Sequence, residues 1–484
     1  MTINSRTGIA LATLALAIAP TVAAAGMCGC PTDLYHPVTL SFFPPISTNG
    51  CPAARVKTNF ALNILGGYVG ALEGVELGGL FNVEKYDATG FQLAGLVNRV
   101  GGSFTGLEVG LLNCVCGDAS GVQLGGFNHA GGDVLVTQLG VGNCAGRCAT
   151  TQFGAANFAG GSTAFTLGGF NICGGNAGLQ LAGVNLTRHQ VWWAQLGGVN
   201  LAGGCATVQL GGFNGAGGNT VLTLGGINLG GADNVVALGG FNLLRGATAF
   251  QLGAINAACG AGERDELGLL RTWHQKSSGA QVGAVNIAGA SVGCQVGAVN
   301  IAHDVRWFQL GAFNFARESE IPVGPLNVIL NGQFRVQVFA SEAGLAHLEL
   351  KTGGRRFYNV LGFAYHPIDT ARVMFGYGVG LHFPCPCPRL YVDADLVGYR
   401  VNPTDDLLSF DGTSYLAKVR ATGGWEIAPP FALIGGLAAN VWLSDAEDGS
   451  DIPILEQVPM YTKEGDTNIS IWPGVLFGFE FRAW

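Results

Sequence analysis

Charged side chains are scarce in this chain. Asp, Glu, Lys and Arg together make up 12% of the 484 residues, which is about half the share found in an average globular domain. The formal net charge is −8 and the pI is about 5.5. The chain therefore lacks the basic surface that nucleic-acid binding requires, and we expect no nucleic-acid partner. Hydrophobic residues still reach 48%, which argues against a disordered chain.

Motifs that carry catalysis or hold a metal are also missing. The sequence has no H-E-x-x-H, no P-loop and no C-x-x-C pair, and its 8 histidines show no ligand spacing. Gly289–Gly293 spells G-x-S-x-G, but a nucleophile elbow needs a helix after it and none is expected here. We therefore predict that the protein is not an enzyme and has no catalytic residue, no cofactor and no metal ligand.

Long apolar runs occur only at the N-terminus. Arg6 supplies a positive start, residues 8–19 are mostly apolar, and small residues lead up to Ala25. This pattern predicts an export signal that is cleaved after Ala25; a lipoprotein attached at Cys28 is the alternative. An exported chain with 13 cysteines is expected to contain disulfides or buried thiols, and the odd number leaves at least one without an intramolecular partner.

Asparagine recurs at a short interval through the middle of the chain. Seventeen segments of the form Q-L-G-G-F-N end on Asn at spacings of 13 to 16 residues, with one gap of 30. We expect Arg271 to fill that gap as the Asn equivalent of an eighteenth copy. Such a period indicates a repeat architecture. The asparagines are Asn82, Asn98, Asn113, Asn128, Asn143, Asn157, Asn171, Asn185, Asn200, Asn214, Asn228, Asn242, Asn256, Asn286, Asn300, Asn314 and Asn327.

One repeat has the length of a single coil of a parallel β-solenoid. Glycine pairs such as Gly211–Gly212 allow tight corners between short strands. We expect the asparagines to form a hydrogen-bonded ladder, and the Gln five positions earlier to form a second one. The Leu four before the Asn, the apolar residue one before it and the Ala two after it are expected to fill the interior. The alternative is that the repeats are strands of one large outer-membrane β-barrel.

The expected surface of the array is poor in charge, with only eight charged residues between 91 and 260. Such a rod should self-associate, meet a membrane or be enclosed. Aromatic residues lie beside charged ones in a few repeats, and we predict a contact with a cell-surface protein or a glycan there. The alternative is that these segments are loops of irregular coils. The candidate surface-contact residues are Arg271, Trp273, His274, Trp192, Trp193 and Trp307.

The C-terminal third changes from the glycine period to alternating runs. Eight strand-like runs are separated by Pro, Asp and Gly turns, aromatics crowd the strand ends, and the chain finishes on Trp484. This pattern predicts an antiparallel barrel of the outer-membrane type; a soluble barrel or sandwich is the alternative. The runs are 334–339, 345–350, 357–365, 373–383, 390–401, 414–427, 431–443 and 469–484.

Several sequence blocks in order resemble a family of bacterial surface-repeat proteins. They are Pro44–Gly50, Asn59–Tyr68, Glu76–Asn82, Gln92–Asn98 and Lys351–Asn359. The resemblance covers nearly the whole mature chain and implies a location at the cell surface or outer membrane of a Gram-negative-type bacterium. It implies no activity and transfers no functional residue. The many cysteines and the low charge depart from the family's general pattern.

The sequence thus predicts an all-β protein built from a β-solenoid-like array followed by an antiparallel β-barrel-like domain. Its expected role is structural, adhesive or partner-binding, at the outer membrane or cell surface. An outer-membrane pore and a secreted soluble binder are the alternatives. The expected segments are a signal peptide at 1–25, a leader or cap at 26–75, the repeat array at 76–328 and the barrel at 329–484.

Overall fold

The computed structural model describes residues 32–258, 263–264, 271–272, 278–367, 372–403, 414–444, 461–463 and 468–483. The chain divides into two compact units, Met1–Gly154 and Ala155–Trp484. The fold is all-β, with a parallel β-solenoid of about 18 turns followed by a closed eight-stranded antiparallel barrel. The predicted fold class is confirmed, and the alternative of one large barrel is wrong. The described residues include no helix long and apolar enough to cross a membrane. The predicted export signal lies outside the described residues.

The first unit holds the opening coils of the solenoid. Within the segment expected as a leader, β4 already pairs in parallel with β6. The strands are β1 (Leu34–Tyr35), β2 (Val38–Phe43), β3 (Ile46–Ser47), β4 (Val56–Asn63), β5 (Gly66–Val69), β6 (Ala71–Gly78), β7 (Phe81–Glu84), β8 (Ala88–Ala94), β9 (Val97–Val100), β10 (Phe104–Val115), β11 (Ala119–Ala130), β12 (Val134–Leu139) and β13 (Gly142–Ala145), with a 3-10 helix η1 at Cys51–Arg55. β14 (Ala149–Ala159) runs across the boundary between the units.

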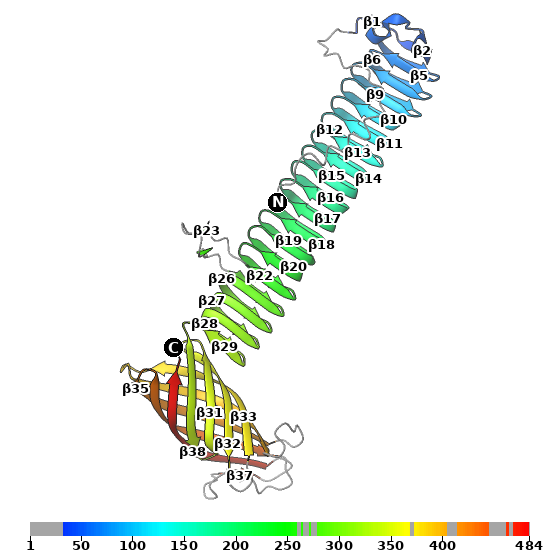
Figure 1. Cartoon of the computed structure of the whole chain (residues 1–484). Helices are drawn as coiled ribbons and strands as arrows, with labels where there is room; N and C mark the ends of the chain where they lie inside the picture. Colours follow the sequence, from blue (N-terminus) through cyan, green and yellow to red (C-terminus); the bar gives the residue numbers. More distant parts are fainter. Residues whose placement is uncertain are drawn as a thin grey trace. The chain divides into compact units, whose positions relative to one another are not determined.

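The second unit continues the coils and then forms the barrel. Its coils stack one on the next (Figure 1). They are in register, so that each Asn pairs with the Asn of the next coil, as Asn214 does with Asn228. The coil strands are β15 (Thr163–Cys173), β16 (Ala177–Thr187), β17 (Val191–Ala202), β18 (Ala206–Ala216), β19 (Thr220–Gly230), β20 (Asn234–Leu244), β21 (Thr248–Leu252), β22 (Ile255–Ala258), β25 (Ser278–Val282), β26 (Val285–Val296), β27 (Val299–Leu310), β28 (Phe313–Val323) and β29 (Leu326–Ile329).

Two side-chain ladders run inside the coils, as predicted. The amide nitrogen of Asn214 donates to Asn228 Oδ1 at 2.9 Å and to the carbonyl of Leu224 at 2.9 Å. In the second ladder, Gln209 Nε2 donates to Gln195 Oε1 at 2.9 Å. These amides are fully buried, so each satisfied bond avoids the desolvation cost of an unpaired polar group. The expected scaffold role of the asparagines follows from this geometry.

The prediction that Leu and the aromatic residues fill the coil interior is wrong. Leu224, four before its Asn, is 47% exposed, and Phe241, one before its Asn, is 51% exposed. Because side chains alternate across a strand, an inward Gln or Asn forces its neighbours outward. Only the Ala two after the Asn lies inside as expected, as Ala216 does. The interior therefore combines the two polar ladders with a row of mostly small apolar residues, such as Val191 and Ala206, while the Leu and Phe of the repeat motif face outward.

The prediction that Arg271 occupies an Asn position in an eighteenth copy is also wrong. The stack passes directly from β22 to β26, where Asn256 pairs with Asn286. Arg271 belongs instead to β24 (Arg271–Thr272), which pairs antiparallel with β23 (Glu263–Arg264) in a sheet of its own. Figure 1 shows β23 beside the coils rather than among them. A 30-residue spacing here reflects an insertion, not a degenerate coil.

The barrel is closed by antiparallel pairing of its first strand with its last. All eight runs predicted from the sequence form its strands. They are β30 (Gln333–Ser341), β31 (Gly344–Gly353), β32 (Phe357–His366), β33 (Arg372–Pro384), β34 (Leu390–Pro403), β35 (Ser414–Ala428), β36 (Phe431–Ser444) and β38 (Asn468–Arg482), and a short strand β37 (Tyr461–Lys463) pairs with β38.

Candidate functional site

The barrel carries its apolar side chains on the outside. Along β38, Val475, Phe477 and Phe479 are 61–63% exposed, whereas the intervening Leu476 is buried and Glu480 is buried in the lumen. On β36, Leu437 is 69% exposed. Soluble antiparallel sheets bury the apolar side and expose the polar one. This barrel has the opposite arrangement along these strands, with large apolar side chains on its outer face.

The lumen holds a buried network of paired charges. Arg335 Nη1 lies 2.8 Å from Asp393 Oδ2 and 3.2 Å from Glu480 Oε2. Gln337 Nε2 donates to Glu480 Oε2 at 2.7 Å, and His382 Nδ1 lies 2.7 Å from Asp393 Oδ1. Arg335, Asp393 and Glu480 are at most 2% exposed, so each charge is compensated by a partner instead of by water.

A second cluster joins the same network. Lys351 Nζ lies 3.2 Å from Asp393 Oδ2 and 2.8 Å from Asp395 Oδ2. Arg420 makes a two-pronged contact with Glu349, with Nη1–Oε1 and Nη2–Oε2 distances of 2.7 and 2.8 Å. The guanidinium also bonds to Asp395. A two-pronged Arg–carboxylate pair fixes orientation as well as charge.

These contacts explain two carboxylates that the sequence left without partners. Asp393 and Asp395 share one face of β34 and are buried in the lumen. Their cationic partners come from β30, β31 and β35. The signal for these partners was present in the sequence, because charged residues alternate with apolar ones in Arg335–Gln337, Glu349–Lys351 and Lys418–Arg420. What the sequence did not show was which strands meet across the lumen.

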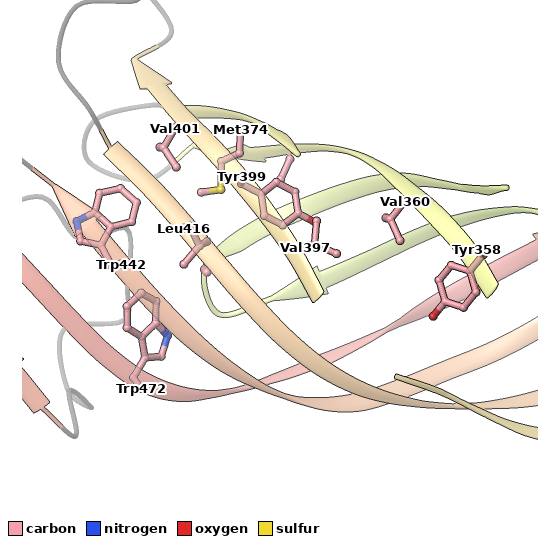
Figure 2. Packing of buried hydrophobic residues seen from close by; sticks show 11 residues of the cluster. Tyr358, Val360, Met374, Val397, Tyr399, Val401, Leu416, Trp442 and Trp472 are labelled. Carbon is pink, nitrogen blue, oxygen red and sulfur yellow. The ribbon is translucent and has the colours of Figure 1, made fainter. Parts of the chain in front are cut away.

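The rest of the lumen is filled by bulky side chains. Figure 2 shows Trp442, Trp472 and Tyr399 among the buried residues of the cluster. Tyr399 donates from its hydroxyl to Glu349, and Tyr358 donates to Asp395 at 3.0 Å. An eight-stranded barrel is just wide enough for its interior to be filled by side chains. The described lumen is thus filled by the ion-pair network and by aromatic residues, two of which bond to that network.

Barrel residues also cap the last coil of the solenoid. Asn359 of β32 accepts a hydrogen bond from the backbone nitrogen of Gly324 at 3.2 Å and donates to the carbonyl of Pro322. Tyr377 donates to the same Asn359 oxygen at 2.6 Å. The last coil otherwise offers unpaired backbone groups to another strand, which is how sheet edges aggregate. Asn359 satisfies two of these groups.

The first unit encloses carboxylates inside the coils. Glu108 lies in the Gln ladder and accepts from Gln123 Nε2 at 2.8 Å. Burial raises the pKa of Glu108 to about 7, although the bond from Gln123 acts in the other direction. Burial, together with the neighbouring Glu76, raises the pKa of Glu84 well above its ordinary value. Loss of water around a carboxyl group favours its neutral form.

The predicted surface-contact residues do not form one site. Trp192 and Trp193 lie on β17 and are 57% and 66% exposed, and Trp307 lies on β27 and is 64% exposed. Seven coils separate the Asn of their repeats, Asn200 and Asn314, which corresponds to roughly 34 Å of stack. For Arg271 the structure describes only the β24 backbone, and Trp273 and His274 lie outside the described residues.

The described cysteines and metal-ligating residues form neither a disulfide at the positions below nor a metal site. The cysteines at positions 51, 114, 116, 144, 205, 294, 385 and 387 are free thiols, so the expectation of disulfides is not met at these positions. Burial raises the pKa of the Cys114 thiol to about 11, which makes it a poor thiolate nucleophile. Within the described ranges, no group of three or more His, Cys, Asp or Glu residues could hold a metal ion.

The paired charges of the lumen join strands on different sides of the barrel. The parts of the candidate site are an apolar outer belt, a charge-paired lumen and a capped solenoid end. Comparison with known protein families, curated proteins and solved structures gave no match for this chain.

Proposed function

We propose that this protein is a non-enzymatic outer-membrane protein whose C-terminal barrel spans the lipid bilayer and anchors the solenoid. The observation that carries this proposal is the inverted polarity of the barrel. Outward side chains such as Leu437 and Val475 are apolar and exposed, and inward charges such as Arg420 and Glu349 are paired. Exposing such an apolar outer belt to water is unfavourable, whereas contact with lipid hydrocarbon is favourable. The role of the solenoid is structural or partner-binding.

A pore is supported less well than an anchor. Arg335, Lys351 and Arg420 cross the lumen to carboxylates on other strands, and their side chains are at most 2% exposed. Trp442 and Trp472 fill a further part of the lumen. Wide barrels that conduct ions keep a water-filled channel instead. A secreted soluble binder is disfavoured by the same apolar belt.

The test is insertion of the full-length chain into lipid vesicles, read by the shift in gel mobility that folded barrels show before heating. Leu437→Lys places a charge at the middle of β36 on the outer face, where a bilayer would oppose it by about 2–4 kcal/mol. We expect a smaller fraction of this variant to insert into the vesicles, and we expect Leu437→Phe to insert to the same extent as the parent chain. Equal insertion of both variants, or recovery of the parent in the soluble fraction, would contradict the anchor. Single-channel conductance would favour the pore.

A further inference from the structure

The solenoid shows the same polarity inversion as the barrel. In every coil of the second unit, three outward positions lie four before, one before and one after the Asn. They hold no polar side chain. Exposed examples are Leu224, Ile227 and Leu229 from a single coil. The three rows are Leu167, Leu181, Leu196, Leu210, Leu224, Leu238, Leu252, Val282, Val296, Leu310 and Val323; Ala156, Phe170, Val184, Val199, Phe213, Ile227, Phe241, Ile255, Val285, Val299, Phe313 and Leu326; and Phe158, Ile172, Leu186, Leu201, Gly215, Leu229, Leu243, Ala257, Ile287, Ile301, Phe315 and Val328.

The apolar surface wraps around an edge of the coils. The first two rows are separated by a corner of small residues, such as Gly225–Gly226, which we call the glycine corner. Beyond the first row, the same side continues with residues such as Leu222 and Val236. Charged side chains lie on the opposite corner, where Arg188 and Arg245 are exposed. The cross-section of a coil is therefore apolar on two sides and one edge, and polar on the other edge.

The area of this apolar surface is larger than that of the largest apolar patch on a typical monomeric protein. The second unit contributes twelve coils, from Asn157 to Asn327, each about 4.8 Å high, and the roughly four or five strand residues on one side of a coil span about 15 Å. One side alone thus presents on the order of 900 Å², compared with roughly 300–600 Å² for the largest patch on a typical monomer. Something other than water must cover it.

The coils are also chemically suited to hydrocarbon. Their backbone groups pair with the coil above and the coil below, as β19 does with β18 and β20. Their polar side chains, such as Asn228 and Gln209, are sequestered inside. Hydrocarbon tolerates only structures that satisfy their own backbone groups. The two apolar sides and the glycine corner meet this condition along the stack.

The exposed tryptophans lie at the boundary between the polar and apolar edges. Trp192 and Trp193 follow the polar corner residues Arg188–Gln190, and Trp307 follows Arg306. All three are more than half exposed. Indole rings concentrate where membrane meets water, because they combine an apolar body with a polar N–H group. This position accounts for the aromatic-plus-charge pattern without a shared binding pocket.

We propose that the solenoid contacts a lipid surface, with its glycine corner and the flanking apolar sides immersed and its charged corner in water. This proposal rests on the proposed function, since the barrel is what brings the chain to a membrane. A second copy of the chain is a less fitting cover, because one flat partner covers one side and leaves the glycine corner exposed. Within one row the side chains range in size from Ala156 to Phe170 while remaining apolar. Fluid acyl chains adapt to such variation, whereas packed protein surfaces require matched shapes.

The proposal is tested with a benzophenone amino acid placed at single positions of the full-length chain. Phe241 and Leu229 report on the immersed rows, Arg245 on the charged corner, and Leu437 on the barrel belt. The protein is reconstituted into vesicles of phosphatidylethanolamine and phosphatidylglycerol and irradiated, and adducts are identified by mass. We expect lipid adducts at Phe241 and Leu229 with yields within about twofold of that at Leu437, and at least about fivefold above that at Arg245.

The outcomes separate this proposal from the one on which it rests. Lipid adducts at Leu437 without any at Phe241 and Leu229 would overturn lipid contact by the solenoid and leave the anchor standing. If lipid adducts are absent at Leu437 as well, both lipid contact by the solenoid and the membrane anchor are overturned. An adduct at Phe241 to a second copy of the chain would replace the lipid surface by a self-association interface. The benzophenone side chain replaces an aromatic residue that is 51% exposed at position 241, so the packed interior of the coil is left unchanged.

Discussion

The side-chain amide of Asn256 donates to Asn286 Oδ1 at 2.9 Å, although thirty residues of chain separate them. Gln281 Nε2 likewise donates to Gln251 Oε1 at 2.6 Å. Both ladders therefore continue across this point without a missing rung. The register of the stack at this point is set by direct pairing of the coils on either side.

Removing the insertion should therefore leave the solenoid intact. In a regular coil, three residues such as Gly217-Gly218-Asn219 connect Ala216 to Thr220. Replacing residues 259–277 by Gly-Gly-Asn restores this connection between Ala258 and Ser278. We expect the thermal unfolding midpoint to change by no more than about 2 °C, because short loops cost little closure entropy. A large drop, measured by circular dichroism, would mean that the insertion supports the stack.

The polar ladder should matter more than the apolar residue beside it. Asn214→Ala leaves the Asn200 donor and the Asn228 acceptor without this partner inside the coil. We expect a loss of about 2–4 kcal/mol in unfolding free energy, because these two amides and the Leu224 carbonyl each lose a hydrogen bond. The matched control is Phe213→Ala at the adjacent outward position, with an expected loss below about 1 kcal/mol in detergent. Denaturant titration measures both, and the reverse order would contradict a polar interior.

Stability of the first unit should depend on pH through Glu108. The folded pKa of this carboxyl group is about 7, above its ordinary value, so the folded state holds the proton more tightly than the unfolded state. The free energy of unfolding should fall as pH rises from about 4.5 to about 7 and then level off. Glu108→Gln removes the part of this dependence that Glu108 contributes and leaves the part that Glu84 contributes; Gln is also the residue found at the matching position of the next coil, Gln123. We expect this variant to be more stable than the parent by about 3 kcal/mol at pH 8 and equal to it at pH 4.

Removing one partner of a lumen ion pair should destabilise the barrel more than replacing both partners by apolar residues. Arg420→Met leaves the buried Glu349 and Asp395 without their guanidinium partner, and we expect a loss of about 3–5 kcal/mol. The double variant Arg420→Met with Glu349→Leu should recover part of this loss, because it removes an uncompensated charge. Urea unfolding in detergent micelles measures both. If the double variant loses the sum of the single losses, the two residues do not act as a pair.

Loop lengths predict which side of the membrane carries the solenoid. The barrel connections at the end where β30 starts and β38 finishes are short, as at Pro429–Pro430 between β35 and β36. At the other end, 23 residues separate β36 from β38. Outer-membrane barrels keep short turns in the periplasm and long loops outside. We expect an epitope tag inserted after Gly449 to be labelled on intact cells, and a tag placed at Arg245 to be labelled only after permeabilisation. The opposite result would put the solenoid at the cell surface.

Most of the architecture was legible in the sequence because each part has its own period. A repeat of 13 to 16 residues ending on Asn predicted the coils, and alternation of single residues predicted all eight barrel strands. Both signals are local, and they need no knowledge of which strands meet. The paired charges could be located in the same way, since Arg335, Glu349 and Asp393 alternate with apolar residues along their strands.

Two predictions were wrong, one about which face of the coil is buried and one about Arg271, because the local sequence pattern does not determine either feature. Apolar residues on both sides of each coil Asn hide which face is buried, and the usual rule that Leu and Phe lie inside then gives the wrong side. The structure resolves this, because Asn214 and Gln209 are fully buried. The spacing between Asn256 and Asn286 is close to two repeats, so it predicts an extra coil around Arg271 where the structure has an insertion. Which partner each charge finds depends on barrel closure, as with Arg420 and Glu349.

The asparagine ladder has a direction. Within each unit, the described ladder amides before Asn327 donate toward the coil of higher number, from Asn63 to Asn82 in the first unit and from Asn157 to Asn171 in the second. The aligned amides polarise one another, so reversing one of them breaks the bonds on both of its sides. At one end, Asn63 Oδ1 is buried without a hydrogen-bond partner; at the other, Asn327 Nδ2 donates to Gly324. The two ends are therefore chemically unlike, as the two ends of a filament are. No further coil could add before Asn63 without displacing β2, whose Ser41 is its register partner, or after Asn327 without displacing Asn359.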